Sequence, residues 1–127
     1  MTRRSVLLLI AGLASAGTAC HVFEGPAATV KRFHVALDGG DIPAALECLS
    51  PKFVEQLGVD KLRAGLQEAA LKLKKKGGIK TFTVEREDTV GEIAEVKTSV
   101  TTGNGERDSD TFKLAQENRV WKIQSPK

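Results

Sequence analysis

The sequence predicts an α+β domain in which N-terminal helices pack on a curved four-stranded antiparallel sheet. Between residues 26 and 76 the apolar residues recur at helical spacing, whereas after Gly78 they alternate with polar residues, as in strands. A sheet with one apolar face needs a cover, and the preceding helices carry the apolar stripes that can supply it. The 127 residues suffice for one domain, which we expect over residues 26–124, with 125–127 as a tail.

Two helices are expected before residue 50. The first begins at Pro26, which suits a first helical turn because its missing N–H has no partner there, and it ends at Gly39-Gly40. Its apolar side carries Val30, Phe33 and Leu37. The second helix is capped by Asp41. It has the clearest apolar stripe in the chain, formed by Ile42, Ala45, Leu46 and Leu49.

Two further helices are expected before the sheet begins. A short one starts at Ser50-Pro51 and ends at Gly58. A long one is capped by Asp60, runs to Lys76 and stops at Gly77-Gly78. The residues expected to point inward from the long helix are Leu62, Leu66, Ala69, Ala70 and Leu73.

Four strands follow, with turns expected at Gly103-Asn104-Gly105 and at Glu117-Asn118. The inner face of the sheet is predicted to carry Phe82, Val84, Ala94, Val96, Thr98, Val100, Phe112, Leu114, Trp121 and Ile123. Residues that alternate with these, Ile93, Glu95, Lys97 and Ser99 among them, are predicted to face outward. Asp110 shares the parity of Phe112, but it precedes the expected strand, so we expect it to be solvated.

The N-terminal 19 residues have the organisation of a secretory signal peptide. Arg3 and Arg4 are followed by an apolar run from Val6 to Leu13 and then by small residues. The apolar run is shorter than the ~20 residues that a membrane-spanning helix requires. The sequence therefore predicts export, with residues 1–19 removed.

Cys20 directly follows the small residues Gly17, Thr18 and Ala19, as in the lipobox of bacterial lipoproteins. We expect cleavage before Cys20, a lipid on its thiol, and a tether over residues 20–25. Gly17 departs from the lipobox pattern, which usually has a branched aliphatic residue at this position. Two alternatives remain open: ordinary signal-peptidase cleavage after Ala16 or Ala19, and a disulfide between Cys20 and Cys48.

Charge and composition argue against nucleic-acid binding. The formal charge of +3 falls to +1 when a leader containing Arg3 and Arg4 is removed, and aromatic residues are not interleaved with the lysines. In Gram-negative bacteria, an aspartate directly after the lipidated cysteine marks a lipoprotein for retention in the inner membrane. This chain has His21 at that position. The expected location is therefore the outer membrane, facing the periplasm.

Three segments carry a family resemblance: "PAATVKRFHVALDGGDIPAALECLSPKF", "LKLKKKGGIKTFTV" and "VWKI". They resemble small bacterial lipoproteins with a domain of unknown function in the nuclear-transport-factor-2-like (NTF2-like), cone-shaped superfamily. The resemblance implies a cone-shaped sheet wrapped around a helix, in some members enclosing a pocket. It implies no activity, because the superfamily includes enzymes, ligand binders and scaffolds.

Catalytic groups are sparse on the predicted inner face. The chain has no tyrosine to stabilise an oxyanion, and the inner face carries no carboxylate in the middle of a strand. Cys48 and the histidines lack the spacing of a metal site, and no cofactor is expected. His34 and Asp38, four residues apart on one helix, are the candidate pair for a small proton-transfer enzyme, an isomerase or dehydratase. A helix-surface ion pair is the simpler interpretation of these two residues.

The favoured function is therefore binding without catalysis, by a domain attached to the membrane through the lipid on Cys20. The residues that could line an apolar pocket are Phe33, Leu37, Phe82, Phe112 and Trp121, while an ordinary core is the alternative interpretation of the same set. The occupant would be a small apolar ligand, or the domain would bind an envelope protein. The predicted outer face of the sheet is polar, which does not favour an apolar dimer.

Overall fold

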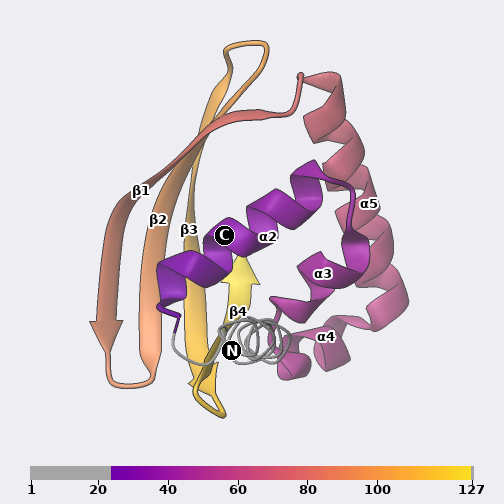
Figure 1. Ribbon diagram of the computed structural model, residues 1–127. Helices are drawn as coiled ribbons and strands as arrows, with labels where there is room; N and C mark the ends of the chain where they lie inside the picture. The colour runs from indigo at the N-terminus through magenta and orange to yellow at the C-terminus, as the bar shows by residue number, and fades with distance from the viewer. Residues whose placement is uncertain (1–23, 127) are drawn as a thin grey trace, which may run out of the picture.

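The computed structural model describes residues 24–126, in which four helices lie against one antiparallel sheet (Figure 1). The helices are α2 (Pro26–Asp38), α3 (Ile42–Glu47), α4 (Pro51–Leu57) and α5 (Val59–Lys75). The strands are β1 (Ile79–Val90), β2 (Ile93–Thr102), β3 (Arg107–Glu117) and β4 (Val120–Pro126), which pair in chain order. The predicted α+β class is confirmed. In this described part of the chain, none of the helices has the length and apolar character needed to cross a membrane.

The helix boundaries follow the capping signals, with one exception. Helix α2 has proline in its first turn and gives way to Gly39, and the Asp41 side chain accepts a hydrogen bond from the Ala44 N–H at 3.2 Å. Asp60 does not cap α5, contrary to the prediction. The cap lies two residues earlier, at Gly58, which adopts a φ of 90°. The Asp60 carboxylate instead pairs with Arg63 one turn along the helix.

Helix α3 is shorter than its apolar stripe predicts. The chain leaves the helix after Glu47 and pairs with β4: the Ser50 N–H donates to the Ile123 carbonyl, and the Ile123 N–H donates to the Cys48 carbonyl, each at 2.8 Å. This bridge places Leu49 in the core. Leu46 was predicted to lie inside with it, but the end of the helix leaves Leu46 only half-buried at the edge of the core.

The strands are longer than the sequence pattern predicts. Strand β3 starts at Arg107, five residues before Phe112, so that Asp110 lies within the strand, opposite Thr98 of β2. Strand β4 continues to Pro126 and so includes residues that were expected to form a tail. The tight turn between β3 and β4 is shifted by one residue, to Asn118-Arg119, whose φ angles are 52° and 65°.

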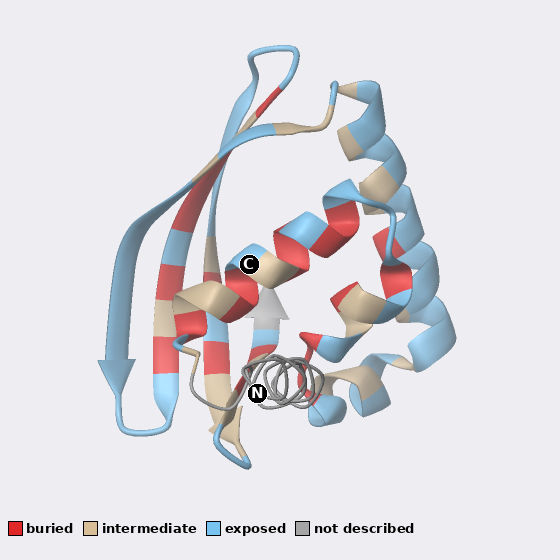
Figure 2. Cartoon of the chain, in the orientation of Figure 1, coloured by how far each residue is buried: buried red, intermediate tan, exposed pale blue. Residues whose placement is uncertain are grey.

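Helix α2 crosses the concave face of the sheet, and the core lies between them (Figures 1 and 2). Its fully buried members include Val30, Ala45, Val96, Leu114 and Ile123. Val84 lies on the predicted face, opposite the buried Thr98, but 39% of it is exposed, so it does not join the core. Strand β1 is an edge strand whose far half is exposed (Figure 2). Its contact with the start of α2 is a hydrogen bond at 3.1 Å from the Ala27 N–H to the Glu87 carboxylate.

The outer face of the sheet is polar, as predicted. Glu85 pairs with Lys97 at 3.8 Å and with Arg107 at 3.1 Å. Ser99, predicted to face outward, is 4% exposed, because Arg107 crosses the sheet and donates a hydrogen bond to its hydroxyl at 3.3 Å. A charged side chain therefore covers a polar residue on this face.

Two turns meet at one end of the sheet, and this contact requires glycine. The Gly103 N–H donates to the Gly78 carbonyl at 2.9 Å, and the Asn104 N–H donates to the Lys76 carbonyl at 2.8 Å. A Cβ on Gly103 would stand 2.7 Å from the Gly77 carbonyl oxygen, with only backbone around it. The sequence identified Gly103 as a hairpin residue but not as the point where two backbones touch.

Replacing Gly103 with alanine is therefore expected to destabilise the domain by about 1–3 kcal/mol, the usual cost of overpacking. Gly65→Ala is the matched control, because Gly65 lies inside α5 with open space around it. It is expected to stabilise the domain by about 0.5–1 kcal/mol through reduced backbone entropy of the unfolded chain. Urea denaturation of both variants measures the difference. Equal stability of the two variants would contradict the close contact.

Candidate functional site

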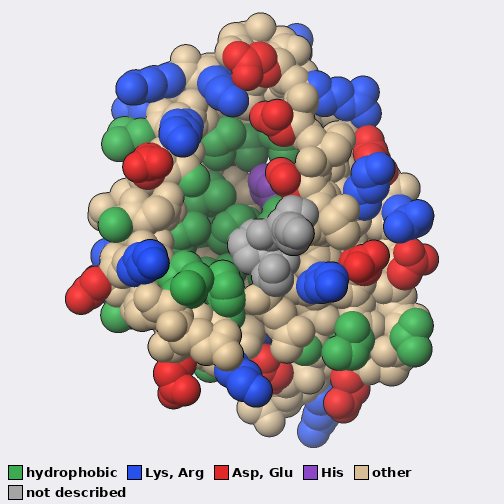
Figure 3. Space-filling view, turned by 180° about the vertical axis from the view of Figure 1, so that it is seen from behind, with side chains coloured by type: hydrophobic (Ala, Val, Ile, Leu, Met, Phe, Trp, Pro, Cys, Tyr) green, Lys and Arg blue, Asp and Glu red, His purple; other side chains and the backbone are tan. Residues whose placement is uncertain are grey.

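A hollow of about 210 Å³ opens between α2, α5 and the ends of β2 and β3. Its apolar wall consists of Leu37, Ala69, Leu73 and Val100, and its polar residues are His34, Lys72, Lys76, Thr102, Asp108 and Asp110. Figure 3 shows a recess in this face, in which a histidine lies beside hydrophobic side chains with acidic groups close by. The hollow therefore combines an apolar wall with a polar edge, as small-molecule sites do.

His34 is held rigidly at the base of the hollow. Only 9% of the residue is exposed, and its Nδ1 lies 2.9 Å from the Val30 carbonyl oxygen. A carbonyl can only accept, so we assign the proton of the neutral ring to Nδ1. The other nitrogen, Nε2, is then an acceptor, and no hydrogen bond within residues 24–126 occupies it.

Three phenylalanine rings surround the imidazole. Its centroid lies 5.0 Å from that of Phe82, 5.4 Å from that of Phe112 and 5.7 Å from that of Phe33. Burial among these rings lowers the pKa of His34 below its usual value, although the Val30 carbonyl and the Asp110 charge oppose the change. At neutral pH the ring is therefore uncharged and its Nε2 can accept a hydrogen bond or a proton.

Asp110 of β3 lines the hollow together with His34. It is directly opposite Thr98 of β2, a position in which Cβ atoms are about 4.5–5.5 Å apart. Within the described residues, neither an ion pair nor a hydrogen bond engages the Asp110 carboxylate. The Thr98 hydroxyl is buried without a partner, which is unusual for a polar group.

The lysines at the rim are neutralised by their own partners. Lys76 lies 3.2 Å from Glu106 and 3.8 Å from Asp108, and Lys72 lies 3.5 Å from Glu68. Hydrogen bonding to the Glu106 carboxylate raises the pKa of Lys76, so this ammonium stays charged and engaged. Asp110 is consequently the charged group of the hollow that lacks an opposite charge.

The predicted His34–Asp38 pair does not form. His34 is buried rather than on the helix surface, and the Asp38 carboxylate accepts a hydrogen bond from the Ile79 N–H at 2.9 Å. The two residues line a separate cavity of about 240 Å³, which Phe82 also lines. Asp38 therefore positions the start of β1, and the acidic neighbour of His34 across the hollow is Asp110.

The predicted pocket residues separate into three groups. Leu37 lines the hollow, whereas Phe33, Phe82 and Phe112 pack on His34 without lining the hollow themselves. Trp121 is core: it is 6% exposed, and its backbone carbonyl accepts a hydrogen bond from the Thr29 hydroxyl at 3.1 Å. The aromatic residues thus support the site more than they line it.

The sequence pattern did not identify Asp110 as a member of the site. Asp108, Asp110 and Phe112 alternate with period two, which was the available signal that β3 begins earlier. Nothing in the sequence indicated that the Thr98 hydroxyl would lack a partner, because that depends on contacts across the sheet.

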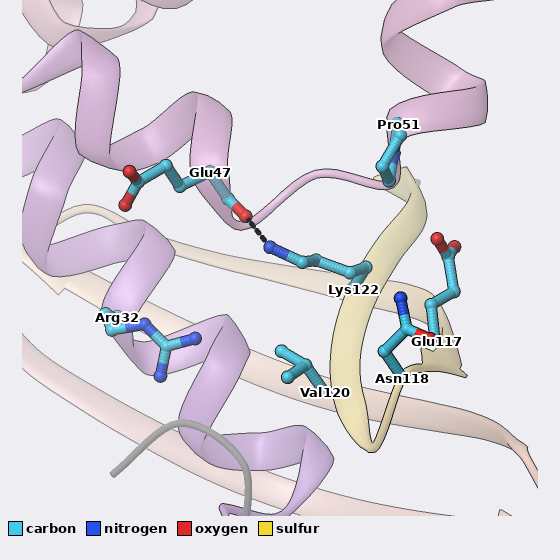
Figure 4. Close-up of a pocket in the computed structure, with 7 residues that line it drawn as sticks. All are labelled: Arg32, Glu47, Pro51, Glu117, Asn118, Val120 and Lys122. Atoms are coloured by element: carbon cyan, nitrogen blue, oxygen red, sulfur yellow. Dashed lines mark hydrogen bonds between the residues drawn. The ribbon is translucent and has the colours of Figure 1, made fainter. Parts of the chain in front are cut away.

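A larger cavity of about 380 Å³ lies where α2, α3, α4 and the β3–β4 turn meet (Figure 4). It carries equal numbers of acidic and basic side chains. Its two cations are already engaged: Lys122 donates to the Glu47 carbonyl, and Arg32 pairs with Glu24. None of the described residues that line this cavity is buried, whereas His34 in the hollow is.

Cys48 lies next to this larger cavity as a free, buried thiol. Its burial raises the thiol pKa, despite the opposing charges of Arg32 and Lys122. Cys20, its partner in the alternative disulfide, lies outside the described residues, as do the predicted cleavage sites. Across residues 24–126, no group of three or more histidine, cysteine or acidic residues is placed to hold a metal ion.

The buried histidine predicts an acid-sensitive fold. Because the folded-state pKa of His34 is lowered, the unfolded chain binds more protons as the pH falls below about 6.5, and stability present above that pH is lost. Urea denaturation at pH 7.5 and at pH 5.5 measures this loss. His34→Gln removes the titrating ring, so its stability should change less over this interval. An identical change in both proteins would contradict a buried, neutral His34.

Comparison with known proteins supports the architecture. A family model described as "Domain of unknown function (DUF4878)" matches residues 18–124. A provisionally assigned NTF2-like transpeptidase from Campylobacter jejuni has a similar crystal structure, with a TM-score of 0.72 at 22% identity, covering 80% of this chain and 99% of that one. A SEC-C motif containing protein from Rhodopseudomonas palustris is similar over 73% of this chain and 70% of its own, with a TM-score of 0.52 at 14% identity. None of the curated proteins matches the sequence significantly. The predicted NTF2-like fold is confirmed.

Proposed function

The chain belongs to the DUF4878 family of domains of unknown function, and from that premise we propose that it is an exported, lipid-anchored binding domain of the bacterial envelope. In this proposal the domain does not catalyse a reaction. It holds a small ligand with an apolar body in the hollow beside His34.

The observation that carries the binding proposal is the hollow itself. A rigid imidazole on a cluster of phenylalanine rings faces an apolar wall, so the recess is pre-formed and a ligand would displace water from apolar surface. The free Nε2 of His34 supplies a hydrogen-bond acceptor that can fix the orientation of a ligand.

The anchor proposal rests on the leader. A basic start, a short apolar run and small residues precede Cys20, the arrangement that a lipoprotein leader requires. The first described helix begins at Pro26, only six residues after Cys20, so a lipid on Cys20 would hold the domain close to the membrane. In a Gram-negative host we propose the outer membrane, on the periplasmic side.

Native mass spectrometry of the protein extracted from its own membranes tests both parts. The expected spectrum shows a chain that begins at Cys20 with a lipid mass added, and a fraction that retains a small molecule. Ala69→Leu places a larger side chain in the wall of the hollow and should abolish the retained ligand while the lipid mass stays.

Ala64→Leu is the matched control, because Ala64 is exposed on the same helix and does not line the hollow. It should leave the added lipid mass and the mass of the retained small molecule unchanged. A mature chain that begins at Gly17 without lipid would refute the anchor. A retained ligand that survives Ala69→Leu would refute the hollow as the site.

A proton-transfer enzyme is the second candidate, because His34, whose Nε2 is unprotonated, lines the same hollow as Asp110. An isomerase or dehydratase of this kind would exchange a carbon-bound proton of a small ketone with solvent. Loss of deuterium from α-deuterated ketones in water, followed by NMR, checks this function. Exchange by the wild type that disappears in His34→Gln would favour the enzyme over the binding domain.

The name of the Campylobacter neighbour raises a third class, acyl transfer. Acyl-transfer enzymes that proceed through a covalent intermediate need an activated nucleophile, such as a thiol of lowered pKa in an accessible site. Cys48 is 1% exposed, and burial raises its pKa. These properties do not favour Cys48 as a nucleophile, and the proposal remains a binding domain.

A further inference from the structure

We propose that the hollow selects ligands that carry a protonated amine, whose ammonium group is received by Asp110 and the Nε2 of His34. This inference rests on the proposed function and specifies the class of ligand that the domain binds. It concerns the polar edge of the hollow, whereas the binding proposal concerns its shape and apolar wall.

Two groups of the hollow, the Nε2 of His34 and the Asp110 carboxylate, are hydrogen-bond acceptors without a partner among the described residues. The Val30 carbonyl fixes the imidazole proton on Nδ1, which leaves Nε2 as an acceptor. The Asp110 carboxylate is also an acceptor, and no ion pair or hydrogen bond within residues 24–126 uses it. Two acceptors at one edge of a recess are complementary to a group that donates, and an ammonium has three donors.

The charge of the hollow also favours an ammonium group. The two rim lysines would repel an ammonium if they were free, but Lys76 is paired with Glu106 and Asp108, and Lys72 is paired with Glu68. The unpaired charge that remains at the hollow is the negative charge of Asp110. A carboxylate or phosphate ligand would have to approach this charge, whereas an ammonium would neutralise it.

Three probes of the same size and different charge test the proposal: benzylamine, which is protonated at neutral pH, benzyl alcohol and benzoate. Each is titrated into the folded domain, and binding is followed by the shifts of backbone amides in ¹H–¹⁵N spectra. Benzylamine is expected to bind about tenfold more tightly than benzyl alcohol, a difference of about 1.4 kcal/mol. Benzoate is expected to bind more weakly than either.

Asp110→Asn is expected to lower the affinity for benzylamine about tenfold, again about 1.4 kcal/mol, and to leave that for benzyl alcohol nearly unchanged. Asp108→Asn is the matched control: it removes the same charge from the same strand and face, but from a carboxylate that pairs with Lys76. It should change the affinity for benzylamine much less.

The outcomes distinguish this inference from the binding proposal. Equal affinities for benzylamine and benzyl alcohol, or equal effects of Asp110→Asn and Asp108→Asn, would overturn selection for an amine and leave a binding hollow. Tighter binding of benzoate would overturn it in favour of the rim lysines. Absence of shifts at the hollow with all three probes would overturn the inference and the proposed function together.

Discussion

Phe112→Ala is expected to destabilise the domain by about 3–5 kcal/mol, the range for removing a buried phenylalanine. Phe112 is 3% exposed, and its ring lies 6.2 Å from that of Phe33 and 5.4 Å from the imidazole of His34. Such a loss is a large fraction of the total stability of a small domain, about 5–15 kcal/mol. Urea denaturation of the wild type and the variant measures it directly.

Val90→Ala is the control for this measurement. Val90 is 81% exposed at the end of β1, so the substitution removes little buried surface and should change the stability by about 0.5 kcal/mol or less. The variant Phe112→Ala should also lose the ordered environment of His34. Similar stabilities of Phe112→Ala and Val90→Ala would show that the phenylalanine cluster does not support the site.

Cys20→Ala is expected to move the protein from the membrane fraction to the soluble fraction. Stable anchoring needs more than one acyl chain, each contributing about 0.8 kcal/mol per buried CH₂, and a variant without the thiol cannot receive them. Fractionation of cells that express the full chain, together with incorporation of labelled palmitate, measures the change.

Cys48→Ala is the matched control, because Cys48 is buried inside the domain and out of reach of a lipid-transferring enzyme. It should remain in the membrane fraction and incorporate label like the wild type. Membrane attachment of Cys20→Ala would contradict the anchor, and release of the wild type would favour cleavage after Ala16 or Ala19.

The fold was predictable where a local signal sets the structure. Pro26, Asp41 and the glycines after α2 and α5 mark helix ends through their backbone preferences and hydrogen bonds, and the change from period 3.6 to period 2 marks the start of the sheet. These signals depend on neighbouring residues alone, so a single sequence contains them.

The site was less predictable because it depends on contacts between distant segments. His34 and its apolar surroundings could be selected by residue type, but its acidic neighbour was assigned by helical spacing to Asp38. The alignment of β2 with β3 decides instead that Asp110 lies opposite Thr98, and no local pattern fixes that alignment. The close approach of Gly103 to Gly77 was hidden for the same reason.

The most direct test of the binding hollow uses small molecules from the host itself. ¹H–¹⁵N spectra of the mature domain are recorded with and without a small-molecule extract of the cell envelope. We expect the extract to shift only the amides around His34, Leu73 and Val100. These shifts should be absent in Ala69→Leu and retained in Ala64→Leu. Shifts centred elsewhere, or shifts that Ala69→Leu leaves intact, would contradict the binding hollow.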